Sequence, residues 1–359
     1  MKGVRILYVG GGDIYARHEL GFIAALTDVG EVDVVAVGIT KVYDRLRIVS
    51  DNGERLVRMY VPTMLNDVGK YDVIFTTPRK ALMEAHKLSK RAGRVPVVLR
   101  LISIRAAKLR DNLRFGAYED ILLFVPSLLA NAAYVGISHC SIAEDHATYS
   151  FARRVYWFFA NRVYKLYPPY GYVLTEAGHS SVDEQVIDRL KELREPYILG
   201  FTSLYGSQLQ MKFEAKPHAV VLYRVAKRLG DVPVVLAGST LDDWKRAFPS
   251  VEPPKNLHLI GRGFSDNVLE TLYRNAKLVI VPVTNRSISN RLLEALFFGR
   301  PVVTSEVVKL IHPELVHGRH VYVSNWDYII DDVIRVARNE ALLHELASGA
   351  KEAYNAFFS

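Results

Sequence analysis

Short apolar runs alternate with helix-forming segments along most of this sequence. The run at Arg5–Val9 leads into three glycines and a helical pattern at Ala16–Leu26, and a second apolar run follows at Val32–Val37. These runs are rich in β-branched residues and are bounded by turn residues, which is typical of strands. Strands that alternate with helices build parallel sheets whose strands are buried on both faces. The chain is therefore predicted to be an α/β protein.

The alternation starts again in the second half of the chain. A strand is predicted at Tyr197–Gly200, and strands and helices then repeat at intervals of roughly 20–25 residues up to the terminal helices. The 359 residues are enough for two domains. We expect two Rossmann-like domains, residues 1–194 and 195–359, that face each other across a cleft, with the C-terminal helices packing back toward the N-terminal domain. Ligands bind at such clefts, beyond the carboxyl ends of the strands.

Composition and spacing exclude several kinds of site. The single cysteine, Cys140, excludes a disulfide framework and a multi-cysteine metal site. The histidines lack the spacing of a zinc motif. The sequence also contains neither a Walker lysine motif nor a G-x-S-x-G nucleophile elbow. The sequence therefore contains none of these metal-binding or nucleophile motifs.

No segment of the sequence is predicted to cross a membrane. The N-terminal apolar run is too short for the core of a signal peptide. The most apolar stretch, Ile121–Ile137, contains Pro126 and Asn131 and lies at the lower length limit for crossing a bilayer. We interpret it as a buried core helix. The protein is expected to be cytoplasmic, either soluble or peripheral at the inner face of the membrane.

The sharpest local pattern is PVTNRSISNRLLEALFFGRPVVT at residues 282–304. A strand ends at Pro282, a polar loop follows, and a helix that contains Glu294 leads to a glycine and another strand. This segment resembles the donor-site region of GT-B glycosyltransferases, especially the retaining enzymes of family 4, through LLEA at 292–295 and GRPVV at 299–303. The resemblance starts at Tyr197 and is strongest over 257–323, whereas the N-terminal half matches only in general architecture.

The resemblance implies that a nucleotide-sugar binds to the C-terminal domain as a substrate, so no cofactor is expected. Glu294 would accept hydrogen bonds from the ribose hydroxyls. The backbone N–H groups at the start of its helix would hold the diphosphate, because helix N-termini bind anions. The residues at that helix start are Ser289, Asn290 and Arg291. The residues beside the base would be Gly261, Arg262 and Gly263.

The sequence departs from the family pattern at two places. The retaining members carry a second glutamate eight residues before the first, where this sequence has Arg286. Arginine has no acceptor for sugar hydroxyls, but it can contact a phosphate or an acidic sugar. Phe201 replaces the arginine of the family's Gly-Arg-Leu. Thr202, Ser203 and Ser207 are candidates for hydrogen bonds to the diphosphate, and Lys212 or Lys216 is the candidate for the lysine that follows in the family.

Candidate residues for the acceptor side lie in the first half of the chain. His139 follows a predicted strand end at Tyr134–Ile137, and His18 lies on the helix after the glycine turn. Either imidazole is a candidate general base or hydrogen-bond partner of a reacting hydroxyl, with a structural role as the alternative. Further candidates are Glu144, Asp145 and His146, the acceptor-side residues Gly11, Gly12 and Arg105, and Arg286 as a third catalytic candidate.

The formal net charge of +8 is concentrated in the first half of the chain. Residues 79–114 carry eleven Lys and Arg against two acidic residues, and residues 151–172 mix basic and aromatic side chains without an acid. Such mixtures suit the membrane–water interface. We predict contact with an anionic membrane surface through 79–114 and 151–172, with a solvated basic face as the alternative. No nucleic-acid partner is expected, because the sequence contains no recognised nucleic-acid-binding module.

These features predict a metal-independent, retaining glycosyltransferase. It would transfer a sugar from a nucleotide-sugar to a hydroxyl of a glycan or a lipid-linked acceptor near the membrane. Three alternatives stay open: a sugar-nucleotide epimerase of the same fold, a non-catalytic relative that binds sugar nucleotides or glycans, and a membrane-surface assembly protein. The replacement of the first glutamate by Arg286 favours the non-catalytic alternative. The composition, with its few glutamines and plentiful Arg, Tyr and Val, also points to a thermophilic source.

Overall fold

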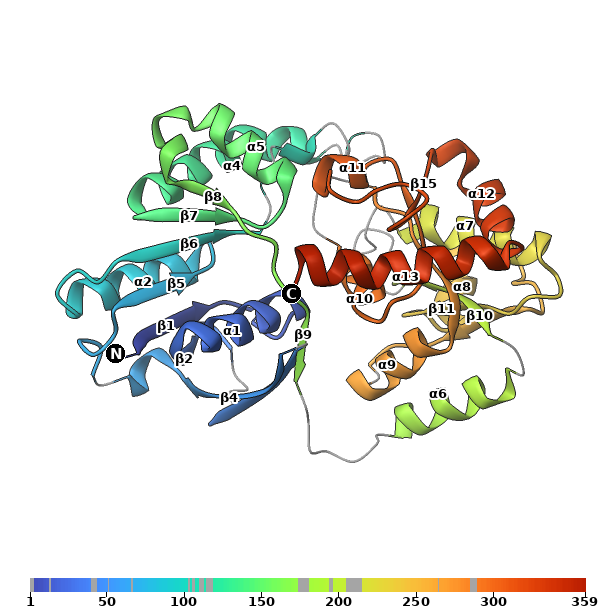
Figure 1. Cartoon of the computed structure of the whole chain (residues 1–359), viewed down its shortest axis with the longest axis horizontal. Helices are drawn as coiled ribbons and strands as arrows, with labels where there is room; N and C mark the ends of the chain where they lie inside the picture. Colours follow the sequence, from blue (N-terminus) through green and yellow to red (C-terminus); the bar gives the residue numbers. More distant parts are fainter. Residues whose placement is uncertain are drawn as a thin grey trace.

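The computed structural model describes residues 3–12, 14–39, 44–50, 52–65, 67–102, 104, 107–109, 113, 119–173, 181–193, 196–204, 215–263, 265–284 and 289–359. The strands in this part of the chain form one nine-stranded sheet and one six-stranded sheet. Figure 1 shows the two sheets as separate layers with helices packed against them. The chain therefore folds into two Rossmann-like α/β domains, as the sequence predicts.

The N-terminal sheet has the strand order β8-β7-β6-β5-β1-β2-β4-β3-β9. Its neighbours pair in parallel except at β3, which is antiparallel to both β4 and β9. This hairpin edge is not predicted by the sequence analysis. The strands are β1 (Val4–Gly10), β2 (Gly30–Ala36), β3 (Arg45–Ser50), β4 (Gly53–Tyr60), β5 (Val73–Thr76), β6 (Val97–Leu101), β7 (Cys140–Ala143), β8 (Val163–Lys165) and β9 (Gly171–Val173).

Both faces of this sheet are buried, because neighbouring residues of a strand point to opposite sides. In β1, Leu7 and Val9 pack in the core that is covered by α2, α4 and α5, whereas Ile6 and Tyr8 pack in the core under α1. Because β1 is buried on both faces of the sheet, every residue in its centre must be apolar, and its sequence is a continuous apolar run. The helices are α1 (Arg17–Val29), α2 (Lys80–Arg91), α4 (Glu119–Ile137), α5 (His146–Val155) and the 3₁₀ helices η1 (Pro62–Met64) and η2 (Trp157–Arg162).

The C-terminal sheet is parallel throughout and has the order β12-β11-β10-β13-β14-β15. Two cores cover its faces. The strands are β10 (Tyr197–Phe201), β11 (Val234–Ala237), β12 (Leu257–Ile260), β13 (Ala276–Val281), β14 (Val302–Ser305) and β15 (Tyr322–Ser324). The helices are α6 (Ser181–Glu192), α7 (Ala215–Arg228), α8 (Leu241–Ala247), α9 (Asp266–Arg274), α10 (Asn290–Phe297), α11 (Val308–Ile311), η3 (Trp326–Tyr328), α12 (Ile329–Ala337) and α13 (Glu340–Phe357).

The chain passes from one domain to the other between β9 and α6, and the end of α13 also contacts the N-terminal domain. Helix α6 precedes the predicted boundary at 194/195, yet the Asp183 carboxylate accepts a hydrogen bond from the Ser265 N–H, just before α9, at 2.7 Å. We therefore propose to group α6 with the C-terminal domain. Helix α13 packs on α10, and its Tyr354 hydroxyl accepts a hydrogen bond from the Tyr170 N–H at 2.9 Å. Figure 1 shows the end of α13 beside the N-terminal domain, as expected.

Helix α4 departs from its prediction. The segment Ile121–Ile137 is helical, but the helix lies on the surface and exposes several large apolar side chains. The expectation of a buried core helix is therefore wrong. Among the helices that the structure describes, none is both long enough and apolar enough to cross a membrane.

Close backbone contact holds α1 against the segment that leads into β9. A Cβ on Gly21 would lie 1.9 Å from the Pro169 carbonyl oxygen, and a Cβ on Gly171 would lie 2.5 Å from the Gly21 nitrogen. Only a residue without a Cβ fits at Gly21. The contact positions α1, and the first two residues of this helix, Arg17 and His18, contact the other domain.

We predict that Gly21→Ala lowers the free energy of unfolding by about 1–3 kcal/mol, because the backbone of α1 must move away from Pro169. Chemical denaturation measured by circular dichroism checks this. Gly230→Ala is the matched control, since a Cβ there meets nothing within 4 Å. Equal stability of the two variants would contradict the close contact.

Candidate functional site

The site lies where the carboxyl edges of the two sheets meet. Helix α1 begins shortly after β1 ends at Gly10, and α10 follows the carboxyl end of β13. In both sheets these strands border the point where the strand order reverses, which is where open α/β sheets bind ligands. The first turns of α1 and α10 are in direct contact there.

Glu294 is the buried carboxylate of this site. It is only 2% exposed, and its Oε2 accepts hydrogen bonds from the Tyr273 hydroxyl and the Arg291 guanidinium, each at 2.6 Å. Burial and the neighbouring Glu294 carboxylate raise the pKa of Tyr273 well above its usual value. The Ser289 hydroxyl caps the helix by accepting from the Leu292 N–H at 3.4 Å. The helix start predicted from the sequence is therefore present, with Glu294 facing inward.

Arg17 brings a positive charge from the N-terminal domain to this carboxylate. Its Nε lies 3.9 Å from Glu294 Oε1, and its guanidinium pairs with Asp266 at the start of α9. Burial works against the charge of Arg17, but Asp266 and Glu294 raise its pKa overall. Arg17 was not among the residues predicted from the sequence. Its position beside His18, in the first turn after the glycine loop, was the available signal.

His18 and Asn290 lie far apart in the sequence and meet in the structure. His18 Nδ1 is 2.9 Å from the Asn290 side-chain oxygen. With that oxygen as the acceptor, Nδ1 carries the proton, and in the neutral ring Nε2 is an acceptor. Nε2 lies 3.6 Å from Glu19 Oε1 and has no hydrogen-bond partner among the described residues. The structure thus brings together two of the residues singled out from the sequence.

A buried charge network fixes the start of α1. Arg100, on β6, donates to Glu19 Oε2 at 2.8 Å and to the Tyr8 hydroxyl, and it also pairs with Glu144. Its guanidinium lies 4.0 Å from the centre of the Phe22 ring. These polar side chains are at most 1% exposed. Burial raises the pKa of Glu144, and the charge of Arg100 opposes that rise.

The buried position of Arg100 changes the interpretation of the basic segment 79–114 as a charged surface. The sequence analysis counted it among the cations of a surface, but the structure places it in the interior, where two carboxylates neutralise it. The Glu144 carboxylate, a candidate from the sequence, likewise forms an ion pair with Arg100. Asp145 caps α5 by accepting from the Thr148 N–H at 2.6 Å, and burial raises the pKa of Asp145 to about 6. His146 contacts the Ser150 hydroxyl at 3.1 Å.

His139 lies at the opposite edge of the sheet from the site. Tyr134–Ile137 belongs to helix α4, so the predicted strand end before His139 is wrong. His139 directly precedes β7, at the amino edge, and its Nδ1 accepts a hydrogen bond from the Val97 N–H at 3.0 Å. His139 was predicted as a site residue because it would follow a strand end, and it does not.

The remaining predicted residues surround the carboxyl edges or lie outside the described residues. A Cβ on Gly11 or Gly12 would meet nothing within 4 Å, so the loop after β1 leaves open space. Ser203 follows the end of β10. Gly261, Arg262 and Gly263 follow β12, and Arg262 pairs with Asp243 at 2.6 Å. Arg105, Lys212 and Arg286 lie outside the described residues. The described residues contain no group of three or more side chains suited to a metal ion.

Phe201 packs against a second arginine of the site, Arg291. The Arg291 guanidinium lies 4.2 Å from the centre of the Phe201 ring, and the Tyr273 ring stacks on Phe201 with the ring centres 5.3 Å apart. A cation over an aromatic face is an attractive contact. Phe201 therefore helps to hold Arg291 beside Glu294.

Comparison with known proteins places this geometry in a known fold. Residues 210–339 match the family model described as glycosyl transferases group 1. The structure is similar to HepE from Anabaena in complex with UDP and glucose (TM-score 0.62, 15% identity, covering 100% of this chain and 96% of that chain). It is also similar to sucrose-phosphate synthase from Thermosynechococcus elongatus (TM-score 0.66, 12% identity, 99% and 95% covered).

A third similar structure is the α,α-trehalose 6-phosphate synthase from Burkholderia multivorans (TM-score 0.58, 12% identity, 100% and 96% covered). No curated protein sequence matches the chain. At these identities the structural likeness establishes the fold, which is GT-B.

The buried network makes a prediction about stability. Arg100→Met leaves Glu19 and Glu144 buried without their cation, which is expected to cost about 3–5 kcal/mol of unfolding free energy. Denaturation curves of Arg100→Met and of Lys87→Met, an exposed cation of the same segment, measure the difference. Adding Glu19→Gln and Glu144→Gln to Arg100→Met should restore part of the loss. Equal stability of the two single variants would contradict the role of Arg100.

Proposed function

We propose that the protein is a glycosyltransferase that transfers a sugar from a nucleotide-sugar to an acceptor hydroxyl. The donor binds to the C-terminal domain and the acceptor to the N-terminal domain. The observation that carries this proposal is the buried Glu294 at the start of α10, with cations from both domains beside it. The match of residues 210–339 to a glycosyltransferase family model supports it.

Glu294 has one oxygen available for the ribose. Oε2 is engaged by Tyr273 and Arg291, whereas Oε1 lies 3.9 Å from Arg17, beyond hydrogen-bond distance. Oε1 accepts the ribose hydroxyls in this proposal, and the N–H groups of the first turn of α10 hold the diphosphate. Gly261, Arg262 and Gly263 border the base.

Arg17 and Arg291 offset the negative charge of the departing diphosphate. In the retaining reaction that we propose, the acceptor oxygen attacks the anomeric carbon from the face that the nucleotide leaves. The bond from that carbon to the phosphate oxygen breaks, and the proton of the acceptor hydroxyl passes to the departing phosphate. No protein nucleophile and no metal ion are needed. Arg286, Ser203 and Lys212 are proposed to contact the phosphates or an acidic donor sugar.

We propose that His18 acts by holding Asn290 at the start of α10, since its Nδ1 lies 2.9 Å from the Asn290 side-chain oxygen. Its Nε2 is buried 3.6 Å from Glu19 Oε1, so the acceptor does not contact that atom. Gly11 and Gly12 leave room for the acceptor near the start of α1. We propose a glycan or a lipid-linked acceptor, and we propose that the exposed cations of 79–114 and 151–172, which do not include the buried Arg100, face an anionic membrane at which the protein is peripheral.

The donor site is tested by Glu294→Gln, which keeps a partner for Tyr273 but removes the charged acceptor. We expect nucleotide affinity to fall about 10–100-fold, because hydrogen bonds to a charged group contribute about 1.5–3 kcal/mol. Calorimetric titration with a panel of sugar nucleotides measures this, and Glu270→Gln on α9 is the matched control. Unchanged affinity and unchanged nucleotide release would rule out Glu294 as the ribose ligand. Donor binding by the wild type without any transfer would favour the non-catalytic alternative.

Arg17 is tested by separating binding from turnover. Because its charge acts on the leaving diphosphate, Arg17→Gln should lower kcat by about 10²-fold and change donor affinity far less. Nucleotide release under saturating donor reports kcat. The control is Arg47→Gln, a partly exposed arginine of the same domain that pairs with Glu54. A pure loss of donor affinity with normal kcat would assign Arg17 to ground-state binding instead.

A further inference from the structure

Helix α4 presents an apolar stripe to solvent. Leu122 is 80% exposed and Leu129 65%, and Val125 and Ile137 are exposed as well. These positions recur at helical spacing and share one face. No charged residue occurs between residues 121 and 137. A surface helix of a globular protein normally carries polar side chains on its solvent-exposed face. The exposed apolar stripe of α4 therefore indicates an interaction surface.

The stripe continues onto η2. Trp157 and Phe158 are 63% and 74% exposed, and their rings stack with centres 3.5 Å apart. The two elements are packed together: the Tyr156 hydroxyl donates to the Leu128 carbonyl at 3.3 Å, and a Cβ on Gly136 would meet the Phe159 ring at 3.0 Å. We call the exposed apolar residues of 121–137 together with Trp157 and Phe158 the α4–η2 surface.

Exposed cations follow the apolar stripe of α4 along the chain, and the two acidic residues of α4, Glu119 and Asp120, stand at its first turn. Arg153, Arg154 and Arg162 are exposed. Between residues 121 and 173 the only acidic residues are Glu144 and Asp145, and both are fully buried. This stretch of the chain therefore offers solvent positive charge beside apolar side chains, which complements a surface that is apolar inside and anionic at its rim.

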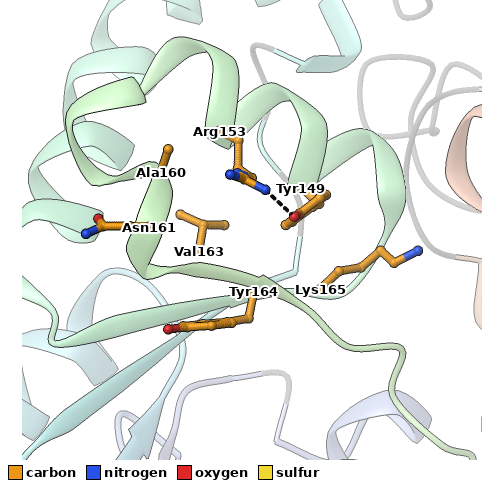
Figure 2. A pocket seen from close by; sticks show the side chains of 7 residues that line it. All are labelled: Tyr149, Arg153, Ala160, Asn161, Val163, Tyr164 and Lys165. Atoms are coloured by element: carbon orange, nitrogen blue, oxygen red, sulfur yellow. Dashed lines mark hydrogen bonds between the residues drawn. The ribbon is translucent and has the colours of Figure 1, made fainter.

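A cavity of about 450 Å³ opens next to η2. Figure 2 shows it between α5, η2 and β8, lined by Tyr149, Arg153, Ala160, Asn161, Val163, Tyr164 and Lys165. Arg153 donates to the Tyr149 hydroxyl at 2.7 Å, and Lys165 pairs with Glu314 of the C-terminal domain. The Arg153 guanidinium is thus hydrogen-bonded to a neutral hydroxyl and is exposed to solvent.

We propose that the α4–η2 surface inserts into the headgroup region of an anionic lipid bilayer, with Arg153, Arg154 and Arg162 against the lipid phosphates. An apolar helix face with Trp and Phe beside basic residues is the composition of interfacial helices. Each exposed cation near an anionic membrane adds to the attraction. The location on the acceptor-side domain deepens the proposed function, since it fits a lipid-linked acceptor. The binding itself stands on the exposure and charge of this surface alone.

Flotation of the full chain with vesicles of phosphatidylcholine, with and without phosphatidylglycerol, tests the proposal. The wild type should float with the anionic vesicles. The double variant Leu122→Glu/Leu129→Glu should lose about tenfold or more of the bound fraction, because two apolar side chains leave the lipid. Val29→Glu/Leu241→Glu is the matched control, as it alters exposed apolar side chains elsewhere. All these positions are exposed, and melting curves verify folding.

The electrostatic part has its own variant. Arg153→Gln/Arg154→Gln/Arg162→Gln should weaken binding to the anionic vesicles and reduce its dependence on salt, whereas Lys245→Gln on α8 should not. Insertion should also shift the Trp fluorescence of the wild type to shorter wavelength, and Trp157→Tyr should remove most of that shift. Equal binding of the arginine variant would overturn the proposed phosphate contacts.

Different measurements test the membrane binding and the proposed glycosyltransferase function. Nucleotide affinity without vesicles reports the C-terminal domain, and the Leu122→Glu/Leu129→Glu variant should retain it. Absence of wild-type flotation, or unchanged flotation of that variant, would overturn the membrane inference even if nucleotide binding is normal. A dimer of the wild type in light scattering that Leu122→Glu/Leu129→Glu dissociates would overturn it too, by showing that a second copy covers the surface. Loss of nucleotide binding alone would not contradict the proposed membrane binding.

Discussion

The arrangement of the site depends on one buried guanidinium. Arg100 is bound to Glu19, Tyr8 and Glu144 in a place where none of these groups contacts water. A buried charge is tolerated only with partners, so the positions of all four side chains are set together. Glu19 belongs to the first turn of α1. Fixing Glu19 fixes the two residues before it, Arg17 and His18, and these reach the other domain.

The contacts between the domains follow from that anchoring. Arg17 meets Asp266 and approaches Glu294, and His18 meets Asn290, so the start of α1 lies against the starts of α9 and α10. A second group of contacts lies near the end of α13, where Glu314 accepts from Tyr167 at 2.6 Å. The donor site that we propose is therefore completed by the N-terminal domain. In that proposal, Arg17 reaches the diphosphate only when the two carboxyl edges face each other.

The sequence predicted the second domain far better than the first. Its strands are short apolar runs between clear turn residues, and LLEA and GRPVV locate α10 and Glu294. The pairing of His18 with Asn290 was beyond a local pattern, although both residues were singled out. Arg100 was misread because a lone arginine in an apolar run does not reveal its buried carboxylates. For α4 the apolar composition was read correctly, but composition does not tell a core helix from one whose apolar face meets solvent. His139 was misplaced because a helix end was taken for a strand end.

The net charge of +8 now divides into parts with different roles. Arg100 belongs to the interior and is neutralised there, so it adds nothing to the field outside. Exposed cations and the apolar stripe lie with α2, α4 and α5 on one face of the N-terminal sheet, while α1 covers the other face. Both α1 and α4 begin beyond the carboxyl edge of this sheet, since they follow β1 and β6. In the function that we propose, an acceptor that enters from a bilayer along α4 would therefore arrive at the same edge to which α1 brings Arg17 and His18.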